Sequence, residues 1–273
     1  MSEVAVRPSP GALLRLTLLI QRRALLWWML AIAVTALLLA ALYPSVRDSG
    51  ASFQDYVDQM PEALKQIFGV DFTSPDGYLW SQLFSSIGPI AFLVYAIGAG
   101  ARGIAGEEES GTLDVVLSTP LRRRTVVRDK ALAMIAGVAL LTIVLFVVLW
   151  VSGPPLDLTV GIEHLAAVHI LQALLAIGFG MIALAIGAAT GRRGLALGVT
   201  SAIAILSYLV WALGSTVDAL APVEPLSPFR WFGEPQPLAD GTTWRNVVVL
   251  AAIPLFAYLV ARVTFDRRDL GSG

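Results

Sequence analysis

The chain has 273 residues, of which 56% are hydrophobic and only 14% are charged, and its mean hydropathy is +0.74. Soluble domains carry about a quarter charged residues, so this composition excludes an ordinary soluble protein. The sequence has no cysteine, which excludes disulfide bonds and thiolate metal sites.

Six apolar runs are long enough to cross a hydrocarbon core about 30 Å thick at about 1.5 Å per helical residue. The sequence therefore predicts an all-α, polytopic membrane protein that forms one domain over residues 1–273. The first run is too long for a signal peptide and lacks a convincing cleavage site, so we expect it to remain in the mature protein. The predicted spans are 24–42, 80–101, 131–151, 165–189, 195–217 and 246–261.

Basic residues are distributed unequally over the two sides of these spans. One side holds 15 of the 19, whereas the other holds only Arg47, Lys65, Arg230 and Arg245. Because loops rich in Lys and Arg stay in the cytoplasm, both termini and the loop between the second and third spans are predicted to be cytoplasmic. The excess of Arg over Lys and the many Ala residues favour a bacterial source, so the predicted location is the bacterial inner membrane.

Two of the predicted spans carry groups of polar side chains. These groups either line a pathway for a substrate or make hydrogen bonds between helices, which are worth about 0.6 kcal/mol each in membranes. Pro89 removes one backbone hydrogen bond and should kink the second span in either case. The candidate pathway residues are Ser81, Gln82, Ser85, Ser86 and Pro89 in the second span and Thr200, Ser201 and Ser207 in the fifth.

The loop at residues 106–124, GEEESGTLDVVLSTPLRRR, combines charge with a short apolar stripe. Leu113, Val116 and Leu117 have i, i+3, i+4 spacing, which predicts a short helix between the second and third spans. Thr119 and Pro120 then predict the N-cap and first turn of a new helix that continues into the third span.

Two interpretations of this short helix remain open from the residues alone. It could lie on the lipid headgroups, which the arginines at 122–124 favour. It could instead dock into another protein, which the acidic run at 107–109 favours because anionic lipid would repel it.

The sequence gives little support for catalysis, for metal binding or for ion-coupled transport. The two histidines, His164 and His169, lack the spacing of a zinc site, and no nucleophile is marked out near them, so no metal-binding or catalytic residue is predicted. No Asp, Glu, Lys or Arg lies clear of the ends of the predicted spans, as an ion-coupled carrier would need, and no P-loop is present. Energy for active transport would have to come from a partner.

The charged loop resembles the loop between the second and third spans of the type-2 ABC permeases, the membrane subunits of many ATP-driven exporters. In that family the loop forms the coupling helix that docks into the ATPase subunit. Glu108, Arg122 and Asp129 depart from the family pattern, in which Arg, a small polar residue and Gly are usual. The residues that match are Glu107, Glu109, Gly111, Thr112, Leu113, Leu117, Thr119, Pro120 and Lys130. The resemblance implies that the ATPase-coupling residues are Glu107, Glu109, Gly111, Thr112, Leu113, Val116, Leu117 and Pro120.

Two other segments are similar to parts of the same family. PSPGALLRLTLLIQRR, ahead of the first span, resembles an N-terminal interfacial elbow helix. Residues 221–241 resemble the re-entrant outer hairpin before the last span, in which Ser-Pro-Phe, aromatic residues and Pro-Leu-x-x-Gly are common.

The resemblance implies a non-catalytic permease subunit that exports an apolar or amphipathic compound, such as a drug, an antibiotic or a lipid. Its partners would be two copies of a separate ATPase, which would bind ATP and Mg, and a second permease, identical or homologous. No cofactor is expected in this chain, and no nucleic-acid partner. The alternatives are a channel or passive membrane scaffold without an ATPase and, more remotely, an intramembrane enzyme.

Overall fold

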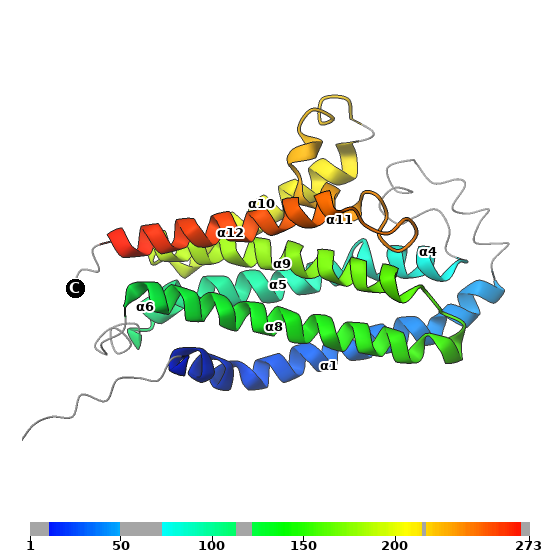
Figure 1. Cartoon of the computed structure of the whole chain (residues 1–273), viewed down its shortest axis with the longest axis horizontal. Coiled ribbons are helices and arrows are strands. Elements are labelled where there is room, and N and C mark those ends of the chain that lie inside the picture. The colour runs from blue at the N-terminus through cyan, green and yellow to red at the C-terminus, as the bar shows by residue number, and fades with distance from the viewer. Residues whose placement is uncertain (1–10, 50–72, 113–121, 215–216, 269–273) are drawn as a thin grey trace, which may run out of the picture.

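The computed structural model describes residues 11–49, 73–112, 122–214 and 217–268, and all regular structure in these ranges is helical. Within them, six helical runs are long and apolar enough to cross a membrane. The prediction of an all-α protein with six spans is therefore confirmed. Figure 1 shows the long helices side by side in one bundle.

The six runs extend beyond the predicted apolar spans at most of their ends, because polar residues at the ends of the spans continue the same helices. All of the runs except the second are single helices, and four of these follow the charged loop. The runs are α1 (Ala12–Asp48), the composite run Pro75–Glu109, α8 (Arg123–Ser152), α9 (Ile162–Thr190), α10 (Arg193–Gly214) and α12 (Trp244–Arg267).

The composite second run is the least regular part of the bundle. Two π-helical turns interrupt it, and in the first of them the Ser85 N–H donates to the Trp80 carbonyl at 2.8 Å. A π turn widens the helix by one residue, and the run is interrupted at Ser85 and Ser86, between η1 and α5. Pro89, which was expected to kink the span, lies in the first turn of α5, where a proline is tolerated. In chain order the pieces are α4 (Pro75–Leu79), η1 (Trp80–Phe84), α5 (Ile87–Ala101), η2 (Arg102–Gly106) and α6 (Glu107–Glu109).

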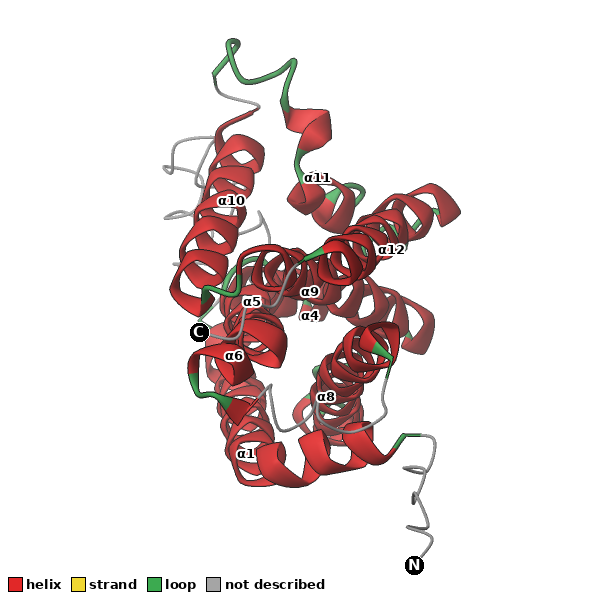
Figure 2. Cartoon of the chain, turned by 90° about the vertical axis from the view of Figure 1, so that its left-hand side faces the viewer, coloured by secondary structure: helices red, strands yellow, loops and turns green. Residues whose placement is uncertain are grey.

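The helix α9 lies at the centre of the bundle, next to α5, α8 and α12 (Figure 2). It approaches α5 very closely: a Cβ placed on Gly100 would lie only 2.1 Å from the Gly180 carbonyl oxygen. Small residues on both helices are needed for such an approach, which increases van der Waals contact where the hydrophobic effect is weak.

The two ends of the bundle differ in charge. One end, which we call the basic end, contains α6 and the turn between α9 and α10, together with the first residues of α1 and α8 and the last residues of α12 (Figure 1). Figure 2 views the molecule from this end and shows that the first turns of α1 lie across it before the helix enters the bundle. The predicted elbow therefore falls on the beginning of a continuous helix and remains a prediction.

The start of the helix that contains the third span was predicted incorrectly. The helix α8 begins at Arg123, and Arg122 before it has extended backbone angles of φ −73° and ψ 138°. A helix that began at Thr119 and Pro120 could not continue through this extended residue into α8. Thr119 and Pro120 themselves lie outside the described residues.

The segment between α10 and α12 folds back onto the bundle. It contains η4 (Glu224–Leu226) and α11 (Pro228–Gly233). Ser227 caps α11 by accepting a hydrogen bond from the Phe229 N–H at 3.2 Å, and its hydroxyl donates to the Ser207 carbonyl of α10 at 2.7 Å. Phe229 reaches Phe179, near the middle of α9, with a ring-centroid distance of 6.0 Å.

Candidate functional site

Three consecutive glutamates, Glu107, Glu108 and Glu109, form α6 at the basic end, and we call them the acidic turn. Gly111 ends the helix with φ +69° and donates its N–H to the Glu108 carbonyl at 3.0 Å. Glycine adopts this left-handed conformation without the strain of a side chain. Each carboxylate of the acidic turn contacts a different part of the chain.

Glu107 forms an ion pair with Lys130 of α8. Lys130 is buried, with a side-chain exposure of 3%, and its ammonium also donates to the hydroxyl of Thr17 in α1 at 3.1 Å. The second carboxylate oxygen of Glu107 is buried and has no hydrogen-bond partner among the described residues. The pair therefore connects α6, α8 and α1, and loss of either member would leave a poorly solvated charge.

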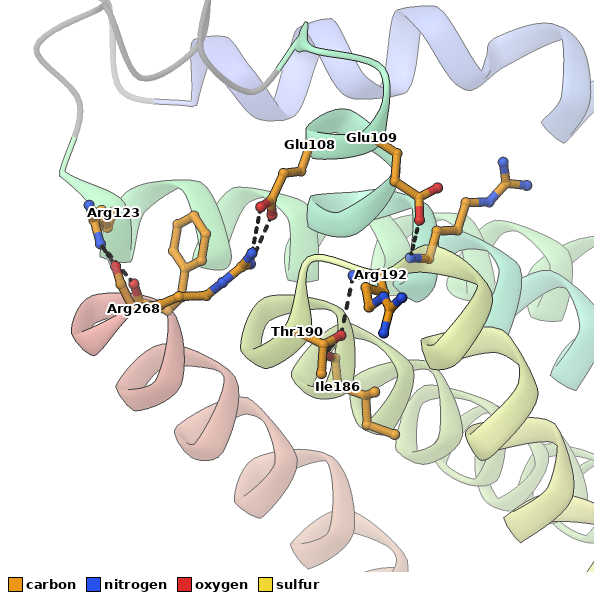
Figure 3. A network of polar contacts seen from close by, with 9 residues as sticks. Glu108, Glu109, Arg123, Ile186, Thr190, Arg192 and Arg268 are labelled. Carbon is orange, nitrogen blue, oxygen red and sulfur yellow. Dashed lines mark hydrogen bonds and ion pairs between the residues drawn. The ribbon is translucent and has the colours of Figure 1, made fainter. Parts of the chain in front are cut away.

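Glu108 binds Arg268, which follows the last residue of α12, through two hydrogen bonds of 2.8 and 2.5 Å (Figure 3). This is the fork geometry in which guanidinium and carboxylate match best. Arg123 of α8 donates to the carbonyl oxygens of Arg268 and Phe265, at 2.5 and 3.3 Å. The end of α12 is thus attached both to the acidic turn and to the start of α8.

Gly191 ends α9 directly beside the Glu108–Arg268 pair. A Cβ at this position would lie 2.3 Å from a nitrogen of Arg268 and 2.6 Å from the Glu108 carboxylate oxygens. The residue also has φ +66°. Any side chain here would displace the pair and strain the backbone, so the position requires glycine.

Glu109 accepts a hydrogen bond from the backbone N–H of Arg193, the first residue of α10, at 2.8 Å (Figure 3). A carboxylate at a helix N-terminus satisfies an N–H group that has no partner inside the helix and interacts favourably with the helix dipole. The acidic turn therefore contacts α8, α10 and the end of α12 directly, and α1 through Lys130.

The predicted coupling residues fall into two groups. Glu107 and Glu109 have partners on other helices, whereas Gly111 and Thr112, which follow them, are exposed and bond to the backbone of the acidic turn, the Thr112 hydroxyl to the Glu107 carbonyl at 3.1 Å. The apolar stripe and the proline, Leu113, Val116, Leu117 and Pro120, lie outside the described residues, so their role remains a prediction. Nothing in the sequence marked Arg268 and Arg193 as partners of the acidic turn, and Glu108 was noted only as part of the acidic run and as a departure from the family pattern.

A groove of about 430 Å³ lies between α5, α10 and α11. Three of the predicted pathway residues, Ser86, Pro89 and Ser201, line it. Its remaining walls are aliphatic except for Gly98, Tyr208 and Phe229: Ile90, Leu93, Val94, Ile97, Leu197, Ala204 and Ile205.

The other predicted pathway residues lie outside this lining. Ser81 and Ser85 are buried and donate hydrogen bonds to carbonyl oxygens of their own helical run, at 3.0 and 2.9 Å. Thr200 is fully buried. Gln82 and Ser207 are half-buried. The structure thus brings three of the eight predicted residues together at one surface, and the others lie away from the groove.

Aromatic residues that the sequence analysis did not select close one end of the groove. Phe229 of α11 packs against Tyr208 of α10 with ring centroids 5.3 Å apart. Trp211 of α10 donates to Glu234 at 3.0 Å, and burial raises the pKa of that carboxyl group. The Ser-Pro-Phe segment that suggested a hairpin was the available signal for this aromatic cluster.

The buried histidine, His169, packs in the core among aromatic side chains. His169 is buried between the rings of Phe84 and Phe146, with centroid distances of 5.2 and 5.3 Å, and one of its ring nitrogens is 2.6 Å from the Leu165 carbonyl. Among the described residues, no group of three or more His, Cys, Asp or Glu side chains could hold a metal ion.

Comparison with known families finds one whose model covers nearly the whole chain. A family model described as "ABC-2 family transporter protein" matches residues 20–270, which include all six predicted spans. The comparison with curated proteins gives no match. The family match covers nearly the whole chain, and its members are transmembrane subunits of ABC transporters. The chain therefore belongs to the ABC-2 transporter family and is a multi-pass permease subunit.

Proposed function

We propose that this permease couples ATP hydrolysis by a separate ATPase, bound at the basic end, to export of an apolar or amphipathic compound. The observation that carries the proposal is the position of the acidic turn. It directly precedes the apolar stripe of the predicted coupling segment and contacts three other parts of the bundle, α8, α10 and the end of α12. A force applied to that segment would reach these helices through charged contacts.

The connection to α10 gives this coupling a route to the groove. Glu109 holds the first residue of α10, and Leu197, Ser201, Ala204 and Ile205 of the same helix form one wall of the groove. The opposite wall is α5, which is continuous through η2 with the acidic turn itself. Movement of the acidic turn would therefore change the separation of the two walls. In this proposal Glu107 and Glu109 transmit movement, and Leu113, Val116 and Leu117 make the contact with the ATPase.

The lining of the groove supports the proposed class of substrate. Mostly aliphatic walls favour an apolar body, and the hydroxyl groups of Ser86, Ser201 and Tyr208 offer a few hydrogen bonds to a polar end. We propose that a second permease, identical or homologous, supplies the other half of the pathway. ATP and Mg would bind only to the two ATPase subunits.

Affinity purification from membranes of the source cell tests the central claim. The tagged chain should retain an ATPase that carries Walker motifs, and the reconstituted complex should transport substrate only with ATP. A chain that purifies alone and conducts solute in vesicles without ATP would instead support a channel, and one that does neither would support a scaffold.

The proposed orientation is tested by labelling single cysteines in this cysteine-free chain. Ser118→Cys, in the charged loop, should be protected from a membrane-impermeant thiol reagent in intact cells, whereas Ser52→Cys should react. The reason is the excess of basic residues on the side of the charged loop. Labelling of Ser118→Cys but not of Ser52→Cys in intact cells would reverse the orientation.

Filling the groove should block transport without releasing the ATPase. Ser201→Trp places an indole between α5 and α10, so we expect the transport rate to fall by about tenfold or more while ATPase retention stays unchanged. The matched control is Val248→Trp on α12, an exposed position that does not line the groove. Equal transport by the two variants would remove the groove from the pathway.

A further inference from the structure

A second groove, of about 370 Å³, lies among α8, α9 and α12 and contains none of the predicted pathway residues. Apart from Arg128 and Tyr258, all of its lining residues are apolar. Those residues are Arg128, Ala131, Leu132, Ile135, Leu174, Ile177, Met181, Ala251, Pro254, Leu255 and Tyr258.

The shape of this groove suits a single hydrocarbon chain. On α8 its lining runs from Arg128 near the basic end to Ile135, a distance of about 10 Å along the helix at 1.5 Å per residue. Small or cyclic side chains at Ala131, Ala251 and Pro254 leave the hollow between the larger residues. The groove is open to the surface, where Leu132 and Leu255 are exposed by 41% and 61%.

Positive charge gathers where the groove meets the basic end. Arg124 of α8 forms an ion pair of 2.5 Å with Asp266 of α12. One helical turn deeper into the bundle on each helix, the corresponding residues are Arg128 and Arg262, so these two arginines flank the mouth of the groove. Arg262 is half-buried and has no ion-pair or hydrogen-bond partner in the part of the chain that the structure describes.

Nearby carboxylates neutralise only part of this charge. Asp129 accepts hydrogen bonds from two nitrogens of Arg128 through one oxygen, at 3.0 and 2.9 Å, and Asp266 is occupied by Arg124. Arg262 therefore adds an uncompensated positive charge, and the Arg128 side chain remains 50% exposed. An apolar groove with an excess cation at its polar end is complementary to an anionic amphiphile.

We propose that this groove binds an anionic phospholipid from the leaflet that meets the basic end. One acyl chain lies between α8, α9 and α12, and the headgroup phosphate is held by Arg262 and the free edge of Arg128. The site is separate from the groove between α5 and α10 and does not depend on the ATPase. The lipid is a bound component that supports the contact between α8 and α12, and it is not the exported substrate.

Lipid retention by the purified permease tests the proposal. Native mass spectrometry after titration with dioleoyl phosphatidylglycerol or dioleoyl phosphatidylcholine should show about tenfold stronger binding of the anionic lipid. Arg262→Gln should remove most of this preference. Ala251→Trp, which fills the groove and leaves the charges, should lower the binding of both lipids. Gel filtration and thermal melting verify that each variant is folded.

Arg23→Gln is the matched control, because Arg23 is an exposed basic residue of α1 and is not part of the groove lining. It should leave binding of phosphatidylglycerol unchanged. If Arg23→Gln weakens binding as much as Arg262→Gln, or if the two lipids bind equally to the unmodified chain, the site is only diffuse attraction of anionic lipid and the proposal fails.

Discussion

Leu113→Asp is expected to abolish retention of the ATPase and transport, while the permease itself stays folded. Leu113, Val116 and Leu117 form the predicted apolar stripe, and burial of each could contribute about 1.5–3 kcal/mol. Together they could supply much of a micromolar contact, about 8 kcal/mol, after association costs. The aspartate removes one anchor and buries an unpaired charge as well.

The measurement is co-purification of the ATPase with the detergent-solubilised variant, followed by transport in vesicles. Leu113→Met is the control, since it keeps an apolar side chain of similar volume and should retain the partner. The isolated ATPase should still hydrolyse ATP. Normal binding and transport by Leu113→Asp would remove this segment from the ATPase contact and leave it as an amphipathic loop on the membrane surface.

Lys130→Met is expected to destabilise the permease and to uncouple it from ATP hydrolysis. The change keeps most of the length of the side chain but leaves the Glu107 carboxylate without its cation, and one oxygen of that carboxylate is already buried without a described partner. Removal of one member of a buried ion pair costs about 3–5 kcal/mol. We expect the lower end of this range, because the Glu107 side chain is 24% exposed. Thermal melting in detergent measures the loss.

A double-mutant cycle separates the pair from general damage to α8. Glu107→Gln with Lys130→Met removes both charges and should recover most of the stability lost in Lys130→Met. If the transmission proposal is correct, the double variant should bind the ATPase but transport more slowly than the unmodified chain. Additive losses of stability from the two single changes would show that Glu107 and Lys130 do not act as a pair.

The spans were predictable because each depends only on local hydropathy and length. The ends were less predictable. Arg122, whose extended backbone separates α8 from the preceding segment, has no sequence signal as clear as Thr119 and Pro120, which suggested an earlier start. The π-helical turn at residues 80–84 also lacks such a signal, since the width of a turn depends on packing against neighbouring helices.

The contacts of the acidic turn could not be predicted from spacing. Glu107, Glu108 and Glu109 meet partners that lie 23, 160 and 84 residues away, and no helical periodicity connects such positions. For the same reason the sequence connected Arg123 only with lipid headgroups, although its side chain donates to carbonyl oxygens at the end of α12.

The rotation of each helix decided which polar residues of the spans reach the groove. Ser201 faces it, whereas Thr200, the next residue back, is fully buried. Both residues lie in the same predicted span, and only the packing of α10 against its neighbours decides which of them faces the groove. Ser81 and Ser85 donate to carbonyl oxygens of their own helical run, which is neither the pathway lining nor the hydrogen bonding between helices that the sequence left open for such hydroxyl groups.

The Glu108–Arg268 pair has a consequence for biogenesis. The ribosome synthesises Glu108 160 residues before its partner, so the first spans are inserted while that carboxylate has only water or lipid headgroups beside it. The pair can form only when α12 has entered the membrane in the correct direction and Arg268 has emerged beside the turn that ends at Gly191. The basic end is therefore completed last, and a docking partner would find its finished surface only on a chain whose sixth span is in place.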